Sequence, residues 1–478
     1  MFCPLSTVSI WMRSNFRQAP KRTGVRTPAI FGAVVVASLA AACGSVNDVT
    51  VDTPGVSRSP QETPGEPAPD WLIARAADAT TTFEVSERSF NLSARNVGLT
   101  ARIRFADGDE VFEAFFDEAS GLGPDYNAEG CTSCHVNNGR LPDAITDGPL
   151  PIGPVVHVSA ADSRRTIPPV SLPGYGTRLQ VDATRGTPEA TVTVAWELID
   201  GTYPDGTPYQ LRRPNLTIVG RDDAFPDDAQ ISLRIPTQVA GPGLLEFVPD
   251  SDLLAAADPD DTDGDGISGT IQWVPDGDTV RIGRHGWKAE NADLLHQTAG
   301  ALADDMGISS SLRPDNTGTE ISDHDLADLA YYVEALAIPA GRDVDDPDVI
   351  AGANLFTSVG CADCHTPQQR TGDTNTAELD DLVIVPFTDL LLHDMGPGLD
   401  DGRPVHMASG REWRTAPLWG IGLLETVNGH ISLLHDGRAR SIEEAILWHG
   451  GEGQTSNDAF QNLTRQDRAK LLRFVASR

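Results

Sequence analysis

The sequence predicts a mainly α-helical protein with two domains, the first of which contains a β-rich insertion. Two observations lead to this prediction. The motif C-x-x-C-H occurs twice, at residues 131–135 and 361–365, and each copy lies between a short apolar segment and a later amphipathic helix. Within the insertion, at about residues 150–280, apolar residues recur at every second position, which is typical of a half-buried strand. We therefore expect a first domain over residues 81–340 and a second over residues 345–478.

Length and charge set the first limits on function. The chain has 478 residues, enough for two or three domains that each have a core. It contains 36 Lys and Arg residues against 69 Asp and Glu residues, which gives a formal net charge of −33. Such a negative field repels nucleic acid and anionic membrane surfaces, so neither is expected to be the main partner.

Residues 1–43 have the pattern of an export signal. A basic region precedes the apolar run Ala29–Cys43, which is too short for a stable membrane span. The run ends at Cys43 after small residues, as in lipoprotein signals, with ordinary cleavage after the Ala-rich site as the alternative. Residues 44–80, rich in Pro, Ser, Thr and Gly, are expected to form a flexible linker. We therefore expect a periplasmic or cell-envelope protein, attached to the membrane only through an N-terminal lipid.

Four further cysteines form the two C-x-x-C-H motifs. The residues of these motifs are Cys131, Cys134 and His135 in the first copy and Cys361, Cys364 and His365 in the second. The pattern is the attachment signature of c-type haem. Two thiols add to the vinyl groups on one edge of the porphyrin, and the adjacent imidazole becomes the proximal iron ligand. Zinc binding and dithiol redox chemistry are alternatives, but neither requires a histidine after both cysteine pairs. The sequence therefore predicts two covalently bound haem c groups in two cytochrome c-like domains.

Each motif has flanking segments that suit such a domain. The apolar residues that precede the motifs are Phe112, Phe115 and Phe116 for the first, and Val349, Ile350, Leu355 and Phe356 for the second. An amphipathic helix capped by Ser322 is expected to close the first domain, with Leu326 and Leu329 on its buried side. A similar helix, capped by Thr464, is expected to close the second.

The β-rich insertion contains the strongest strand signal in the chain. Val192, Val194, Trp196 and Leu198 occupy alternate positions, with polar or small residues between them. A Pro204-Asp205-Gly206 turn follows, and a second strand-like segment returns after it. This pattern predicts a β-hairpin.

Three later stretches carry a resemblance to a known family. They are "RHGWKAENADLLHQTAGALADDMGISS", "DLLLHDMGPGLDDGRP" and "GREWRTAPLWGIGLLETVNGHISLLHDGRARSIEEAILWHGGE". Together with the two motifs, they resemble the di-haem oxidoreductases, also labelled thiol-oxidoreductase-like, which are relatives of the bacterial di-haem cytochrome c peroxidases. The resemblance implies two covalent haems and a peroxidase or electron-transfer role on the periplasmic side. His285 stands where this family usually has an aromatic residue, so no shared role is assigned to it.

The sixth iron ligand decides what a haem does, because a His/Met pair suits electron transfer and an open position admits an oxidant. Met306 and Met395 both lie in Asp-Met-Gly turns, which place a side chain on a loop. We take Met306 as the candidate distal ligand of the first haem and Met395 as that of the second. Core packing is the alternative for both.

Several histidines and two other polar residues are weaker candidates. His393 is a rival to Met395, and His157 is a distal candidate for the first haem. His435 and His449 are interpreted as hydrogen-bonding scaffold residues in preference to ligands. No catalytic acid or base is assigned, and Glu290 and Gln297 are only loose candidates for that role.

The segment "DPDDTDGDGISG" suggests a separate cation site. Asp261, Asp263 and Asp265 alternate before Gly266, as in oxygen-rich loops that bind Ca²⁺. The twelfth position of such a loop, usually Glu, is Gln272. An acidic surface turn without a cation is the alternative.

The sequence thus leads us to expect an exported di-haem c-type oxidoreductase that is peroxidase-like. Its partners would be an electron-donor protein, such as a small cytochrome, and peroxide or another small oxidant. Two alternatives stay open: an electron-transfer cytochrome without peroxidase activity, and a cell-surface module in metal uptake.

Overall fold

Two pairs of crossing helices and a long β-hairpin organise the described part of the chain. The structure is a computed structural model that describes residues 67–73, 78–161, 169–221, 225–315, 318–374 and 376–478. These residues belong to one compact unit, Glu62–Arg478. The expected signal over residues 1–43, with Cys43, lies outside the described residues, as does most of the linker over residues 44–80.

The α-helices, in chain order, are α1 (Asp70–Ile73), α2 (Leu99–Glu113), α3 (Cys131–Cys134), α4 (Pro242–Glu246), α5 (Asp250–Ala256), α6 (Leu294–Met306), α7 (Asp323–Glu334), α8 (Pro347–Ser358), α9 (Cys361–Cys364), α10 (Leu424–Asn428), α11 (Ile442–Leu447), α12 (Gln454–Asn462) and α13 (Arg465–Ala476). The strands are β1 (Thr81–Thr82), β2 (Asp125–Tyr126), β3 (Gly148–Pro149), β4 (Val155–Ser159), β5 (Arg178–Leu179), β6 (Asp182–Ala183), β7 (Ala190–Thr202), β8 (Pro208–Gly220), β9 (Gln230–Arg234), β10 (Trp273–Asp276), β11 (Thr279–Ile282), β12 (Ile338–Pro339), β13 (Gln369–Arg370), β14 (Val383–Ile384), β15 (Leu392–Asp394) and β16 (Glu412–Arg414).

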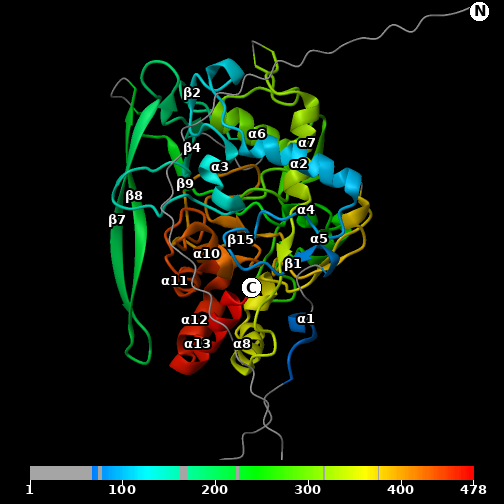
Figure 1. Ribbon diagram of the computed structural model, residues 1–478. Coiled ribbons are helices and arrows are strands. Elements are labelled where there is room, and N and C mark those ends of the chain that lie inside the picture. The colour runs from blue at the N-terminus through cyan, green and yellow to red at the C-terminus, as the bar shows by residue number, and fades with distance from the viewer. Residues whose placement is uncertain (1–66, 74–77, 162–168, 222–224, 316–317, 375) are drawn as a thin grey trace, which may run out of the picture. The chain divides into compact units, whose positions relative to one another are not determined.

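The first helix pair consists of α2 and α7 (Figure 1). Helix α7 begins after Ser322, whose hydroxyl accepts a hydrogen bond from the backbone N–H of Asp325 at 3.1 Å. Leu326 and Leu329 are almost completely buried in the core that α7 shares with α2. The predicted helix and its cap are therefore confirmed. Phe115, one of the apolar residues before the first motif, does not join this core: α2 ends at Glu113, and the Phe115 side chain is 67% exposed.

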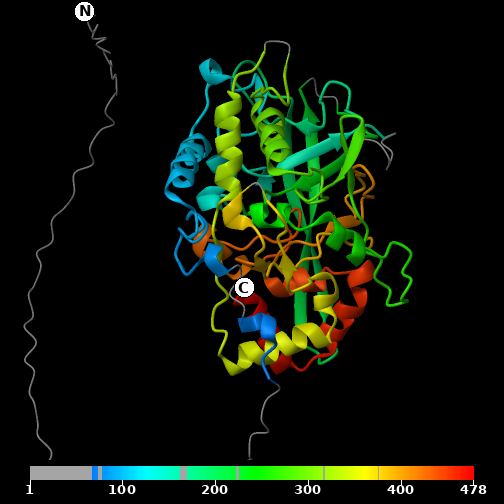
Figure 2. The same cartoon turned by 90° about the vertical axis from the view of Figure 1, so that its right-hand side faces the viewer.

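The second helix pair consists of α8 and α13. Helix α13 begins after Thr464, which accepts a hydrogen bond from the backbone N–H of Asp467 at 3.1 Å, as predicted. Phe356 of α8 and Phe474 of α13 are buried against each other, with ring centres 5.2 Å apart. The two helix pairs lie toward opposite ends of the described body (Figures 1 and 2).

Strands β7 and β8 form the long hairpin that the sequence predicts. They pair antiparallel from Ala190 opposite Gly220 to Thr202 opposite Pro208, and the Pro204-Asp205-Gly206 turn lies between them. The predicted alternation of buried and exposed residues is present near the base of the hairpin, where Val192 is buried. It is absent toward the tip, where Leu198 is 57% exposed.

The hairpin tip reaches the C-terminal helices. The carboxylate of Asp205 pairs with Arg468 of α13 at 2.6 Å, and the hydroxyl of Tyr203 donates to Glu443 of α11 at 2.7 Å. The insertion predicted within the first domain therefore runs along one side of the described body and also supports the helices after the second motif (Figure 1).

The remaining strands form small sheets. One three-stranded sheet has the order β3-β7-β8 and another the order β5-β4-β9. The two-stranded ladders are β1-β12, which is parallel, and the antiparallel pairs β2-β6, β10-β11, β13-β14 and β15-β16. No helix within the described ranges is long and apolar enough to cross a membrane.

The prediction of a mainly α-helical fold is wrong. The structure is only 31% helical, and 20% of it is strand. Strands β13 to β16 lie far outside the predicted insertion at residues 150–280. Segments such as residues 366–420 are rich in Gly, Pro and Asp, which disfavour helix, so they enter the core as loops and short ladders. The division into two domains at residues 340–345 stays a prediction.

Candidate functional site

Two large cavities each contain one C-x-x-C-H motif. The first, of about 1320 Å³ including its mouth, is lined by Cys131, Cys134 and His135. The second, of about 1390 Å³, is lined by Cys361, Cys364 and His365. Most other lining residues are apolar, as suits a large ligand that buries most of its surface.

The two motifs are built alike. Each cysteine pair forms one helical turn, α3 or α9, which places both thiols on one side of the chain. The histidine follows as the C-cap, and its backbone N–H donates to the carbonyl of the first cysteine at 2.9 Å for His135 and 3.0 Å for His365. One phenylalanine ring lies beside each imidazole: Phe112 lies 6.4 Å from His135 and Phe356 lies 6.3 Å from His365, centre to centre.

The helix crossings explain why these phenylalanines are placed so similarly. A Cβ on Gly108 of α2 would lie 2.1 Å from the carbonyl oxygen of Asp328, and a Cβ on Gly352 of α8 would lie 2.1 Å from that of Lys470. Only glycine allows so close an approach of two helices. Phe112 and Phe356 lie one helical turn after these glycines, so each crossing directs an aromatic ring toward the motif histidine.

Burial sets the protonation state of both motifs. It raises the pKa of the Cys131 and Cys361 thiols to about 12. It lowers the pKa of the His135 and His365 imidazoles to about 4. A raised thiol pKa disfavours a reactive dithiol, and a neutral imidazole is the form that binds iron. Among the described residues, the four motif cysteines do not gather around one point, so they do not form a shared zinc site.

The two cavities share a wall. Arg140, Trp287, Arg414, Ala416 and Pro417 line both of them. Trp287 is held by a hydrogen bond from its Nε1 to the carbonyl oxygen of Ile235 at 2.7 Å, and it is nearly buried.

Arg140 and Arg414 in this wall carry positive charges that suit an anionic ligand. Both are buried, burial lowers the pKa of each to about 10, and neither pairs with a carboxylate among the described residues. Among the described residues, the guanidinium of Arg140 donates only to the carbonyl oxygen of Ser432, and its Nε has no partner. Buried charges are normally paired. A haem brings two propionate carboxylates, so these residues fit the group that the motifs predict. Sequence reasoning missed both arginines, because nothing in their local sequence marks them.

Met306 and Met395 each line one of the two cavities, and Met306 lies at the end of a helix instead of on the predicted loop. Met306, the last residue of α6, lines the first cavity, and Met395, which follows β15, lines the second. Their roles as iron ligands stay predictions.

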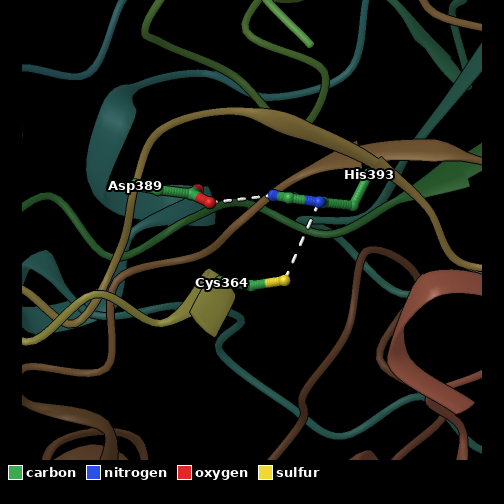
Figure 3. Close-up of side chains that lie close together, drawn as sticks. All are labelled: Cys364, Asp389 and His393. Carbon is green, nitrogen blue, oxygen red and sulfur yellow. Dashed lines mark hydrogen bonds and ion pairs between the residues drawn. The ribbon is translucent and has the colours of Figure 1, made fainter. Parts of the chain in front are cut away.

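The second cavity also contains three histidines: His393, His435 and His449. His393 lies beside the motif, and Figure 3 shows it between Asp389 and Cys364. Its Nε2 is 2.9 Å from Asp389 and its Nδ1 is 2.7 Å from Glu452, so both ring nitrogens are engaged. His435 stacks on Trp413, with ring centres 3.8 Å apart.

The weaker candidates for the first cavity divide into two groups. Gln297 and His285 line the cavity, and Nε2 of His285 lies 3.4 Å from Glu246. His157 and Glu290 do not line it. Glu290 forms an ion pair with the buried Arg234 instead, and His157 lies buried on β4.

The acidic loop brings its three aspartates together. Side-chain oxygens of Asp261, Asp263 and Asp265 all lie within 4.8 Å of one another. Gln272 points elsewhere: it is buried, and its amide donates to the carbonyl oxygen of Lys288 at 3.0 Å. The loop therefore lacks a ligand from its twelfth position, and calcium binding stays a prediction.

Comparison with known proteins identifies the family. A model of the family described as "Di-haem oxidoreductase, putative peroxidase" matches residues 170–326 and 315–478, which include the second motif but begin after the first. A solved structure of hydrazine synthase from Kuenenia stuttgartiensis, determined under xenon pressure, aligns over 91% of this chain and 100% of its own at 14% identity, with a TM-score of 0.35. No match was found among curated proteins. The chain belongs to the di-haem oxidoreductase family.

Proposed function

We propose that this protein is a c-type cytochrome oxidoreductase with one covalent haem in each cavity, which passes electrons to peroxide or another small oxidant. The observation that carries the proposal is the common wall of the two cavities, each of which has its own C-x-x-C-H motif. When bound, haem iron supplies one-electron redox chemistry.

The common wall would hold the two haems close together. Trp287 is the largest side chain that lines both cavities, and its hydrogen bond to Ile235 fixes its orientation. The positive charges of Arg140 and Arg414 lie beside both cavities. They offset the negative charge that an electron brings to a haem, which favours reduction of either haem.

The first cavity is the better place for a small oxidant. Its lining includes the amide of Gln297 and the imidazole of His285. The Oε1 atom of Gln297 accepts a hydrogen bond from Asn291 at 2.8 Å, so this amide is held in one orientation. A fixed polar group of this kind can orient a small polar molecule.

We also propose that Asp261, Asp263 and Asp265 bind Ca²⁺ through their clustered carboxylates. Calorimetric titration of the metal-free protein should show one calcium-binding event that is lost in Asp263→Asn. Absence of heat in the unchanged protein would refute this part.

We also propose that the protein is exported and receives electrons from a donor protein. The apolar run Ala29–Cys43 supports export with lipid attachment at Cys43, and the negative net charge suits a donor with a basic surface. Labelled palmitate should be incorporated into the unchanged protein and not into Cys43→Ser. Equal incorporation in the two would contradict the lipid attachment.

A peroxide-reduction assay tests the main proposal. The holoprotein, with its haems reduced, should be reoxidised by peroxide, and carbon monoxide should bind one of the two haems. An electron carrier without peroxidase activity predicts that neither haem binds carbon monoxide in any redox state. That result would reject the peroxidase role while leaving the haems in place.

A further inference from the structure

The second cavity contains a histidine placed as a counterpart to His365. Both His365 and His449 line the cavity, and their ring centres lie 6.4 Å apart. Imidazole nitrogens bind first-row metal ions such as zinc at about 2.0–2.1 Å. Two such bonds, with about 1 Å from each nitrogen to its ring centre, place the centres of opposing rings roughly 6 Å apart. The observed spacing therefore suits one metal ion held between the two rings.

Backbone hydrogen bonds determine which nitrogen of each ring is free. Nδ1 of His365 lies 3.0 Å from the carbonyl oxygen of Phe387, and Nδ1 of His449 lies 2.8 Å from that of Ala445. A carbonyl only accepts, so Nδ1 donates in both rings and the lone pair lies on Nε2. Metal-bound histidines usually make this contact with their other ring nitrogen. Both imidazoles therefore have the tautomer that iron requires.

The main chain around His449 is held firmly. His449 follows Trp448, the C-cap of α11. The side-chain amide of the buried Asn457 donates to the carbonyl oxygens of Leu447 at 3.1 Å and of His449 at 2.8 Å. The imidazole thus projects from a fixed backbone, as a preformed ligand does.

The rival side chains are less well prepared. Both ring nitrogens of His393 already contact carboxylates. Met395 lies next to His449: its Cε and the Cδ2 of His449 lie 3.2 Å and 3.4 Å, respectively, from the position of a Cβ on Gly453. Met395 can therefore pack against the imidazole while His449 occupies the cavity.

We propose that His449, and not Met395, is the sixth ligand of the iron bound by His365. This inference rests on the proposed function, because it requires a haem attached to Cys361 and Cys364. It assigns the second haem to electron transfer, since an iron with two imidazole ligands has no open position. The oxidant must then bind in the first cavity, which requires that Met306 does not occupy the sixth position of the first iron.

Spectroscopy of the full-length protein with both haems tests the proposal. Electron paramagnetic resonance and near-infrared magnetic circular dichroism of the ferric protein should show one low-spin haem with two imidazole ligands. In His449→Gly that signal should be replaced by a high-spin signal, and added imidazole should restore it. Met395→Leu, the matched control in the same cavity, should leave the two-imidazole signal unchanged.

Two results would overturn the ligand assignment: an unchanged spectrum in His449→Gly, or loss of a methionine-to-iron charge-transfer band in Met395→Leu. A second variant, His449→Met, guards against a folding defect, and it should stay low-spin with a higher midpoint potential than the unchanged protein.

Denaturing mass spectrometry of each sample separates the ligand assignment from the proposed function. Two attached haems without the predicted spectra would reject the ligand alone, whereas absence of attached haem would reject the proposed function.

Discussion

The Nε2 atom of His393 lies 2.9 Å from the Oδ2 atom of Asp389, and both side chains are almost completely buried (Figure 3). On its other side, His393 contacts Glu452 at 2.7 Å, and Glu452 also accepts hydrogen bonds from Ser268 at the end of the acidic loop. Burial lowers the pKa of His393, but its hydrogen bonds to Asp389, Cys364 and Glu452 outweigh this effect and hold the pKa well above 6.5. A charged imidazole therefore ties together the second motif, β15 and the acidic loop.

This contact predicts a pH-dependent contribution to stability. The raised pKa of His393 stabilises the fold fully below 6.5, and the effect is lost as the pH rises through the folded-state value. Burial raises the pKa of Glu452, but its hydrogen bonds with His393, Asp394 and Ser268 together outweigh that effect and hold the pKa below 4.5. This contribution to stability is therefore lost as the pH falls. The free energy of unfolding lost in His393→Leu should therefore be greatest between about pH 4.5 and 6.5, at about 3–5 kcal/mol.

Chemical denaturation of the holoprotein across this pH range measures the difference. His324→Gln is the matched control, because His324 is an exposed histidine that also contacts an aspartate. It should change stability by less than about 0.5 kcal/mol. The same loss in His393→Leu at about pH 6 and pH 9 would show that His393 is not charged in the folded protein.

The glycines at the helix crossings should not tolerate alanine. Gly108→Ala and Gly352→Ala force a methyl group against a backbone carbonyl, so each should lower the free energy of unfolding by at least about 1–3 kcal/mol. Gly300→Ala in α6 is the control, because the nearest atom to its new Cβ would be 3.9 Å away. It should be neutral or stabilising by up to about 1 kcal/mol. Equal effects at all three positions would contradict the close crossing.

Arg140 and Arg414 should raise the potentials of both haems. Removing a buried positive charge stabilises the oxidised form, so Arg140→Gln and Arg414→Gln should each lower both midpoint potentials in a redox titration. Arg213→Gln on the exposed part of the hairpin should change neither. A change confined to one haem would show that these arginines do not serve both cavities.

Trp287→Leu should slow the redistribution of electrons between the haems, because it removes the largest side chain of the common wall. Rapid mixing with a substoichiometric reductant, followed at a wavelength that separates the two haems, measures this rate. Trp196→Leu on the hairpin, which lines neither cavity, is the control. Equal rates in the two variants would remove Trp287 from the electron path.

The motifs and capped helices could be predicted because their signals are local. Ser322 and Thr464 mark helix starts through bonds to residues three positions later, and the hairpin follows from alternation near Val192. The common wall could not be predicted, because Arg140 and Trp287 lie far apart in the sequence and meet only through tertiary folding. The mainly helical expectation failed because segments rich in Gly and Pro, such as residues 366–420, form loops and short ladders that line the second cavity together with helices.

The central claim, one covalent haem in each cavity, is tested most directly by denaturing mass spectrometry of the protein expressed with haem-attachment machinery. The unchanged chain should have the added mass of two haems. The double variants Cys131→Ala/Cys134→Ala and Cys361→Ala/Cys364→Ala should each have the added mass of one. An unchanged chain whose mass shows no attached haem would contradict the account.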